Sequence, residues 1–341
     1  MTNMQQFFEQ GGAIDNAGDQ FEVESGFVSP LSELSLLELT GDDAASFLHN
    51  QLTNDVEHLG LNEARLAAYC SPKGRMLASL YFWKTTEGIF LQLSNTLQPA
   101  IQKRLQMFVM RAKAKLSDVS GQYRMLGIGG ASSDTVLQQW FPQLPTQVHA
   151  KVDNDFGTLI RVAYAFGFAR YQWIAKNETL ECQWPTLQEK LTLVSAHWWR
   201  FAEIMSGTPH ITEITQDKFV PQMVNFELIG GVNFKKGCYP GQEIVARSQY
   251  LGKLKRRMAI AGCSLNDLQA GAEVFSKSDP SQPCGMIVNA IASPNGTEDG
   301  SVCLVELKLA DLEAGEVYVG LPDGPALQFL PLPYPVLDVT Q

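Results

Sequence analysis

A single cysteine, Cys238, lies in the chemically most suggestive stretch of the sequence, FKKGCYPGQEIVAR, which runs from Phe234 to Arg247. A cysteine there could act as a nucleophile, because basic neighbours favour a reactive thiolate. It could also bind a metal, or be a small residue in a turn shaped for a ligand. Nucleophilic catalysis needs a base as well, and the histidines nearest in sequence, His197 and His210, stand in no familiar context. The residue types alone leave these alternatives open.

The same stretch begins a local reversal of charge. Between Lys235 and Arg257, seven lysines and arginines stand against one acid, Glu243, in a chain whose net charge is −10. A second run, residues 103–115, has five basic residues and no acid. Basic runs are often solvated faces, but two of them in an acidic protein favour an anionic ligand with phosphate or carboxylate groups. A polyglutamylated cofactor, a tRNA backbone or an acidic partner protein would fit.

Two glycines shape the stretch around the cysteine. Gly237 and Gly241 flank Cys238, Tyr239 and Pro240, and glycine permits a positive φ or a close approach of the backbone to a ligand. We therefore expect a shaped loop here, followed by a helix or strand that opens near Glu243.

The bulk composition bounds the class of protein. The chain has 341 residues, 45% of them apolar, which predicts more than one packed unit. Its six cysteines form no C-x-x-C pair, so we expect reduced and mostly buried thiols and no zinc ribbon. The N-terminal stretch lacks the pattern of a signal peptide, and no segment approaches 18 apolar residues. We expect a cytoplasmic protein without a membrane span.

Pro, Gly and apolar periodicity predict the elements that must position these residues. They indicate a β-hairpin around Ser71-Pro72-Lys73-Gly74, a helix over 97–110 with Pro99 in its first turn, and helices near 132–140 and 195–205. After about residue 255 we expect only short strands. The predicted organisation is a polar, loosely held N-terminal arm (1–30), an α+β body of two interleaved subdomains (31–250) and a C-terminal β-barrel domain (251–341).

The long motif NFKKGCYPGQEIVAR carries a family resemblance. It is similar to the signature K-G-C-Y-x-G-Q-E of the YgfZ family of folate-binding proteins associated with tRNA modification, which are relatives of the glycine-cleavage T-protein, an aminomethyltransferase. Supporting pieces lie in the expected order along the chain, namely LTGDDAASFLHNQLTNDV, AAYCSPKGRMLASLYFW and FVPQMVNFELIGGVNFKKGCY.

The resemblance implies an α+β, T-protein-like multidomain body around a central funnel, with a C-terminal β-barrel and with tetrahydrofolate or a derivative in the funnel. It further implies a monomer that acts in the cytoplasm in the upkeep of iron–sulfur enzymes or their assembly factors, including enzymes that thiolate tRNA. A weak or indirect contact with tRNA and a link to the control of replication initiation belong to the same expectation. The spacing of the cysteines indicates no metal site.

The resemblance also assigns residues. Cys238 matches the motif cysteine on which the action of the family depends. Trp199 matches a family tryptophan and could stack on a flat heterocycle, whereas Leu34 stands where an earlier tryptophan would be. The other predicted folate-binding residues belong to the signature: Lys236, Tyr239, Gln242, Glu243 and Arg247.

The sequence departs from the T-protein at two places. A pair of aspartates near the reacting amine of folate is replaced by Ala78 and Ser79, so the group that handles the proton is missing. The glutamate that grips the pterin is replaced by Met205, and Glu203 lies two residues earlier. We therefore disfavour a working aminomethyltransferase.

Three functional hypotheses follow from these observations. The first is a folate-binding accessory protein for iron–sulfur and tRNA-modifying enzymes, without turnover of its own. The second is a folate-dependent one-carbon transferase with a different catalytic acid. The third is a tRNA-binding module that uses the two basic runs.

Overall fold

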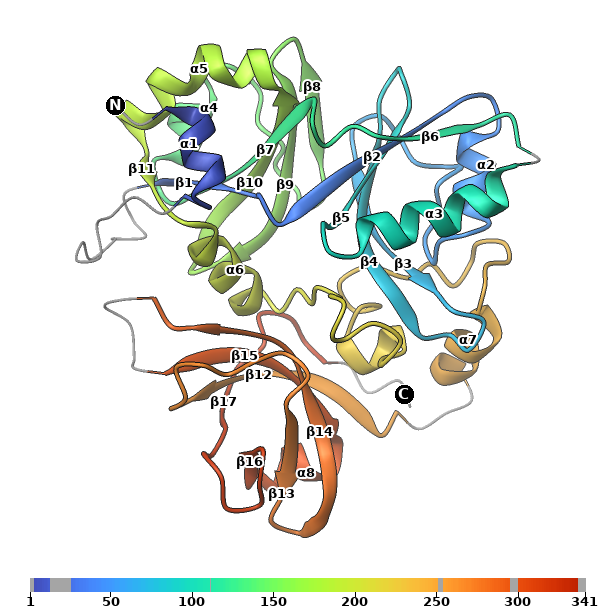
Figure 1. Ribbon diagram of the computed structural model, residues 1–341, viewed down its shortest axis with the longest axis vertical. Coiled ribbons are helices and arrows are strands. Elements are labelled where there is room, and N and C mark those ends of the chain that lie inside the picture. Colours follow the sequence, from blue (N-terminus) through green and yellow to red (C-terminus); the bar gives the residue numbers. More distant parts are fainter. Residues whose placement is uncertain (1–2, 13–25, 111, 251–253, 295–299, 337–341) are drawn as a thin grey trace. The chain divides into compact units, whose positions relative to one another are not determined.

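The computed structural model of the chain (Figure 1) describes residues 3–12, 26–110, 112–250, 254–294 and 300–336. The chain divides into two compact units, each assembled from segments that are distant in sequence. The first unit comprises residues 1–47, 57–65 and 81–202, and the second comprises residues 48–56, 66–80 and 203–341. Among the helices that the structure describes, none is both long and apolar enough to cross a membrane.

The first unit contains a six-stranded sheet in the order β11-β1-β7-β10-β9-β8. Strand β1 runs parallel to β11, and the other pairs are antiparallel. Helices α1, α4 and α5 pack apolar side chains into the same core as β7 and β10 (Figure 1). The elements are α1 (Met4–Glu9), β1 (Phe27–Pro30), β7 (Tyr123–Gly129), α4 (Ser133–Leu137), β8 (Lys151–Asn154), β9 (Gly157–Ala165), β10 (Phe168–Lys176), α5 (Asn177–Lys190) and β11 (Thr192–Leu193).

The N-terminal segment differs from the expected polar arm. Met4 and Phe7 of α1 are buried, and the Phe7 ring lies 4.8 Å from that of Trp184 in α5. All four residues of β1 are buried as well. The few apolar residues in this polar stretch are therefore the ones that hold it to the core, while residues 13–25 of the predicted arm lie outside the described residues.

A second sheet has the order β3-β4-β5-β2-β6. The predicted hairpin joins β3 to β4, and its turn is closed by the Gly74 N–H, which donates to the Ser71 carbonyl at 2.8 Å. Strands β3 and β4 each pass from one unit to the other, at residues 65/66 and 80/81. The elements are β2 (Leu34–Thr40), α2 (Ala44–His49), β3 (Ala64–Cys70), β4 (Met76–Lys84), β5 (Ile89–Ser94), α3 (Gln98–Val109) and β6 (Lys115–Asp118).

The C-terminal strands form a closed antiparallel barrel in the second unit. Its sheet order is β16-β13-β14-β15-β12-β17. Residues 325–330 close it, because the Leu327 N–H donates to the Val317 carbonyl of edge strand β16 at 2.9 Å, while residues 328–330 form the other edge strand, β17, which pairs with β12. The strands are β12 (Arg256–Cys263), β13 (Glu273–Ser276), β14 (Asp279–Ala292), β15 (Ser301–Lys308), β16 (Val317–Val319) and β17 (Gln328–Leu330).

Helices complete both units. Predicted helices are present as α3, α4 and α6 (Ala196–Met205). The 14-residue α5 was not predicted, because Pro185 interrupts its pattern, and α8 (Leu309–Ala314) corrects the expectation of strands alone after residue 255. A short 3₁₀ helix, η2 (Pro221–Val224), and α7 (Gln242–Tyr250) precede the barrel. The contact-based division falls at residues 202/203, and the predicted domain boundary at 250/251 stays a prediction.

Because Phe7 is fully enclosed and Phe8 is half-buried, we expect losses of stability of different size from two neighbouring substitutions. Phe7→Ala should destabilise the first unit by about 3–5 kcal/mol through loss of buried ring area and the cavity left behind. Phe8→Ala should cost only about 1 kcal/mol, mainly the contact of its ring with the Arg124 guanidinium. Thermal unfolding followed by circular dichroism measures both effects. An unchanged midpoint for Phe7→Ala would favour the original prediction of a loosely held N-terminal arm.

Candidate functional site

The signature motif lies in the second unit, where it is joined to residues 48–56. The Thr53 hydroxyl donates to the Gly231 carbonyl at 2.6 Å, and the Asn54 amide donates to the Gly230 carbonyl at 2.7 Å. The Asn233 N–H donates to the Thr53 carbonyl at 2.9 Å. The polar residues of LTNDV are thus used to hold the chain that leads into the signature.

Lys236 is buried and continues this connection. Its ammonium donates to the carbonyl of His49 and, at 2.8 Å, to that of Leu52. His49 is the last residue of α2, where backbone carbonyls lack partners within the helix. The ammonium also lies 4.9 Å from the ring centroid of Tyr239, in cation–π range. Lys236 therefore caps α2 and fixes the loop, and its predicted contact with folate stays a prediction.

Gly241 closes the loop against the β3–β4 turn. Its φ is +80°, and a Cβ there would clash with the Ser71 carbonyl oxygen and lie 2.6 Å from the Gly74 Cα. Gly237 has no such constraint, because a Cβ on it would meet only the His49 ring, at 3.5 Å. Of the two glycines that flank the cysteine, Gly241 is required by the geometry.

Cys238 is exposed at the tip of this loop. Its position rules out the interpretation of a small buried residue. Cys70, in β3 of the same unit, is buried, and burial raises the pKa of its thiol above the usual range. Burial also raises the pKa of the Tyr239 phenol, which stays protonated at neutral pH. Among the described residues, no group of three or more His, Cys, Asp or Glu is placed to hold a metal ion.

The histidine beside the loop is His49, which the sequence did not single out. Its Nε2 faces Gly237, and its Nδ1 lies 3.1 Å from Asp55 Oδ1. The sequence contains the spacing His-x₅-Asp around the end of α2, but this spacing alone does not indicate a functional pair. Its place beside the signature loop depends on the packing of residues 230–236 against residues 48–56. His210, one of the two candidates nearest in sequence, instead pairs with Glu203 at 2.9 Å.

The remaining signature residues start and end α7. Gln242 is half-buried, and its side chain donates to the Gly237 carbonyl at 3.4 Å. Glu243 is exposed in the first turn and Arg247 in the last, where each charge is favourable to the helix dipole. Both remain accessible to a ligand, which makes them the signature side chains best placed for the predicted folate contact.

The basic residues between Lys235 and Arg257 do not form one exposed surface. Arg257 is buried with Glu227, with 3% and 4% of the two side chains exposed, and Arg256 pairs with Glu306 inside the barrel wall. Burial raises the pKa of Glu227 although Arg257 opposes it. Together with Lys236, these residues leave Lys235, Arg247 and Lys255 as the exposed, described cations of the run. The expected anion-binding surface of seven charges is therefore corrected to a smaller one.

At the place of the T-protein aspartates, the structure gives both substitutes a structural role. Ala78 is fully buried in β4, and the Ser79 hydroxyl accepts the Ile211 N–H at 3.0 Å. Met205, in the last turn of α6, is half-buried, and the buried Glu203 is held by His210. Neither residue 78 nor residue 79 therefore supplies a carboxylate.

Trp199 and Leu34 belong to the first unit. Trp199 is 4% exposed, its ring is in contact with Gly127, and the Arg170 guanidinium lies 4.5 Å from the ring centroid. Leu34 begins β2 opposite Ser94. The expected stacking of Trp199 on a heterocycle stays a prediction, and these contacts already occupy much of its ring.

A second aromatic group lies next to Trp199 and joins α6 to the β9–β10 turn. Phe201 packs edge-on against Trp198, with centroids 5.8 Å apart, and stacks with Phe166 at 5.2 Å. Phe166, in the β9–β10 turn, is 36% exposed and has a φ of +56°, a conformation that is uncommon outside glycine. Sequence reasoning missed this group because Phe166 lies 35 positions from Phe201.

Comparisons with known proteins cover most of the chain. The family model of the GCVT N-terminal domain matches residues 24–163. The tRNA-modifying protein YgfZ of Blochmanniella pennsylvanica is 30% identical over 235 residues, which are 68% of this chain and 70% of that protein. The tRNA-modifying protein YgfZ of an Enterobacter species is 26% identical over 306 residues, 89% of this chain and 92% of that protein.

A solved structure shares the fold. The glycine cleavage system aminomethyltransferase T from Bartonella henselae superimposes with a TM-score of 0.71 at 14% identity, over 93% of this chain and 87% of that one. The α+β class with a terminal β-barrel, expected from the sequence, is confirmed.

The two loop glycines provide a matched pair of variants. Gly241→Ala should destabilise the protein by about 2 kcal/mol or more, because a side chain at positive φ is strained and would clash with the β3–β4 turn. Gly237→Ala should change stability by less than about 0.5 kcal/mol. Urea unfolding compares them, and equal effects would show that the loop is not closed as described.

Lys236 and Lys235 provide a second pair. Lys236→Met should cost about 1–3 kcal/mol, because it removes the hydrogen bonds that the ammonium donates to the His49 and Leu52 carbonyls. Lys235→Met, at an exposed position, should be close to neutral. The same unfolding measurement applies, and a neutral Lys236→Met would contradict its role as the cap of α2.

Proposed function

Because the chain belongs to the YgfZ family, we propose that it is a folate-binding accessory protein in the modification of tRNA, with no aminomethyl transfer of its own. The relatives are named tRNA-modifying proteins, which supports a role of this chain in tRNA modification. The resemblance of the signature supports tetrahydrofolate as the ligand and iron–sulfur enzymes that thiolate tRNA as the partners. The link to replication initiation stays a prediction.

One observation carries the proposal, namely the construction of the signature loop. Its frame is fixed by the buried Lys236 and by Gly241, whereas Cys238 is exposed and Arg247 remains accessible on α7. The resemblance of the signature makes Cys238 the functional cysteine, and its exposure leaves the thiol accessible to another molecule. We infer that Cys238 acts on something outside this chain.

The absence of transfer chemistry rests on Ala78 and Ser79. Aminomethyl transfer requires proton movement at the folate amine, and an acid or base positioned there contributes substantially to the rate. Here one residue has no polar side chain and the hydroxyl of the other accepts a backbone N–H. A one-carbon transferase would need its acid elsewhere, so we place this hypothesis second.

Folate binding is tested by the affinity of tetrahydrofolate for purified protein, measured by calorimetry. We expect binding by the wild type and a weakening of about tenfold or more in Arg247→Ala, which loses a charge-assisted contact with a ligand carboxylate. Lys190→Ala, an exposed lysine outside both basic runs, is the matched control and should bind normally. Failure of the wild type to bind would contradict the proposal, and formation of methylenetetrahydrofolate from an aminomethyl donor would favour the transferase instead.

The role of Cys238 is tested separately, in cells that depend on this protein for tRNA thiolation. Cys238→Ala should keep its fold and its affinity for tetrahydrofolate but lower the level of thiolated nucleosides, measured by mass spectrometry of digested tRNA. Cys182→Ala replaces the other exposed thiol and should leave that level unchanged. Equal levels of thiolated nucleosides in both variants would contradict a role of Cys238 in tRNA thiolation.

A further inference from the structure

Helix α3 of the first unit contains the start of the second basic run, residues 103–115. Within this run, Arg111 lies outside the described residues. None of the residues predicted to bind folate belongs to the run. The function proposed above therefore gives its lysines and arginines no role.

The two faces of α3 differ in burial. Ile101 and Leu105 are buried against the protein. Lys103, Met107 and Met110 are all exposed, and their spacing places them together on the opposite face of the helix. Met110 follows the last residue of α3 and keeps helical backbone angles. A surface helix usually carries polar side chains on its outer face, whereas two methionines stand there in α3.

These methionines belong to an apolar patch that consists of Met107, Phe108 and Met110. Their exposed fractions are 59%, 54% and 84%, respectively. Single exposed apolar residues are common on protein surfaces, but contiguous ones mark sites of interaction. Methionine is flexible and polarisable, so it adapts to the apolar surface of a partner.

The charge around the apolar patch is positive. Helix α3 contains Lys103 and Arg104 and no Asp or Glu, and the exposed Lys113 follows the helix. Asp43 is the acid that approaches this segment, where its carboxylate accepts the Lys113 backbone N–H at 2.7 Å. An acidic group that approaches the outer face of α3 therefore meets cations of the helix itself.

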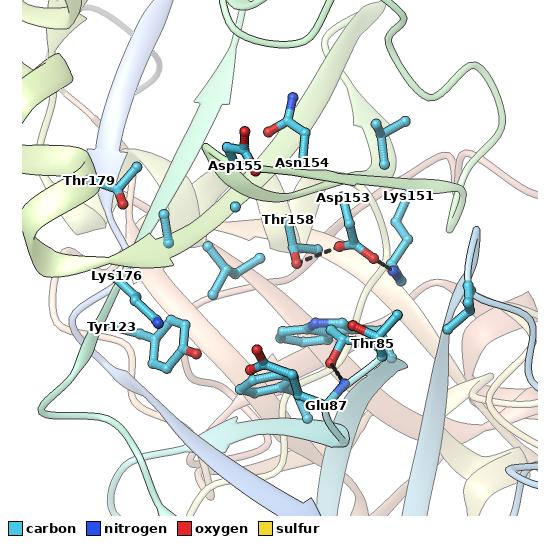
Figure 2. Close-up of a pocket in the computed structure, with 18 of the residues that line it drawn as sticks. Thr85, Glu87, Tyr123, Lys151, Asp153, Asn154, Asp155, Thr158, Lys176 and Thr179 are labelled. Atoms are coloured by element: carbon cyan, nitrogen blue, oxygen red, sulfur yellow. Dashed lines mark hydrogen bonds and ion pairs between the residues drawn. The ribbon is translucent and has the colours of Figure 1, made fainter.

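Another surface of the same unit has the opposite charge. The cavity of about 740 Å³ in Figure 2 is lined by the acids Glu87, Asp153 and Asp155 and by the bases Lys151 and Lys176. Lys151 is buried and pairs with Asp153, which leaves one acid in excess. The whole chain has a net charge of −10. The positive charge of α3 is thus a local feature of an acidic protein.

The apolar patch decides which kind of acidic partner fits. Single-stranded RNA binds where several aromatic rings alternate with cations, whereas methionines offer a phosphate neither a donor nor a stacking ring. An anionic bilayer is extended, and the acidic remainder of the chain would repel it. A short protein segment covers the patch alone, packs apolar side chains on it and pairs its carboxylates with the flanking lysines.

We propose that the outer face of α3 docks an acidic amphipathic segment of a partner protein. The docking surface consists of the apolar patch with Lys103 and Lys113. The apolar side chains of the segment would lie on the patch, as in other complexes in which an amphipathic helix is recognised by its apolar face. The inference does not depend on the folate proposal, because the two use different residues.

The test uses the full chain with ¹³C-labelled methionine methyl groups, whose NMR signals report on Met107 and Met110 directly. The probe is a synthetic amphipathic peptide of leucine and glutamate, and a scrambled peptide of the same composition keeps the charge but loses the apolar face. We expect the amphipathic peptide to shift both methyl signals saturably. It should bind about tenfold more tightly than the scrambled peptide, because only its leucines can cover the patch together.

Variants at exposed positions separate the two contributions, with binding measured by the fluorescence anisotropy of labelled peptide. The double variant Met107→Gln/Met110→Gln should weaken binding about tenfold through loss of apolar contact, and Lys103→Glu should weaken it by a similar factor through charge repulsion. The matched controls are Leu61→Gln, at an apolar residue of the same unit that is 52% exposed, and Lys176→Glu, at an exposed lysine of the cavity rim. Both controls should bind like the wild type.

The proposal is overturned if the amphipathic peptide does not bind, if the scrambled peptide binds equally well, or if the double methionine variant binds like the wild type. It is also overturned if an RNA oligonucleotide or vesicles of phosphatidylglycerol shift the signals of Met107 and Met110 at lower concentration than the peptide. These results would assign the surface to nucleic acid or to a membrane instead.

Discussion

The buried ammonium of Lys236 is the contact on which the candidate site depends. Removing an ammonium from water is unfavourable unless its donors find partners, and here two carbonyls and the Tyr239 ring supply them. The bond to His49 joins residues 187 positions apart in the sequence. It thereby ties the signature loop to the end of α2, so a movement of the loop would break the hydrogen bonds that the ammonium donates to the two carbonyls. The exposed Cys238 has a fixed base for this reason.

Local patterns in the sequence predicted local structure well. The β3–β4 hairpin followed from Pro72 and Gly74, and α3 followed from Pro99 and its apolar spacing. The sequence-based predictions failed where a residue type is compatible with more than one structure. Pro185 hid α5, although the helix accommodates it, and the apolar residues of α1 were too few to predict that they are buried.

The sequence predicted where the candidate site lies, but not which contacts hold it in place. The family signature located the loop, and its glycines indicated a shaped turn. Charge alone could not separate Lys236, Arg256 and Arg257, which hold the fold, from Arg247, which remains accessible. That distinction depends on partners such as Glu227 and Glu306, which no spacing in the sequence connects to them.

The chain shares its fold with an aminomethyltransferase, but Ala78 is buried in β4 and the Ser79 hydroxyl accepts a backbone N–H. In the proposed function, Cys238 acts on another molecule from a loop that lies close to the bound folate. The most direct measurement is the rate of Cys238 alkylation in a Cys182→Ser background, followed by mass spectrometry with and without saturating tetrahydrofolate. We predict rapid alkylation of the free protein and clear protection by the folate. Bound folate with an unchanged alkylation rate would contradict the claim.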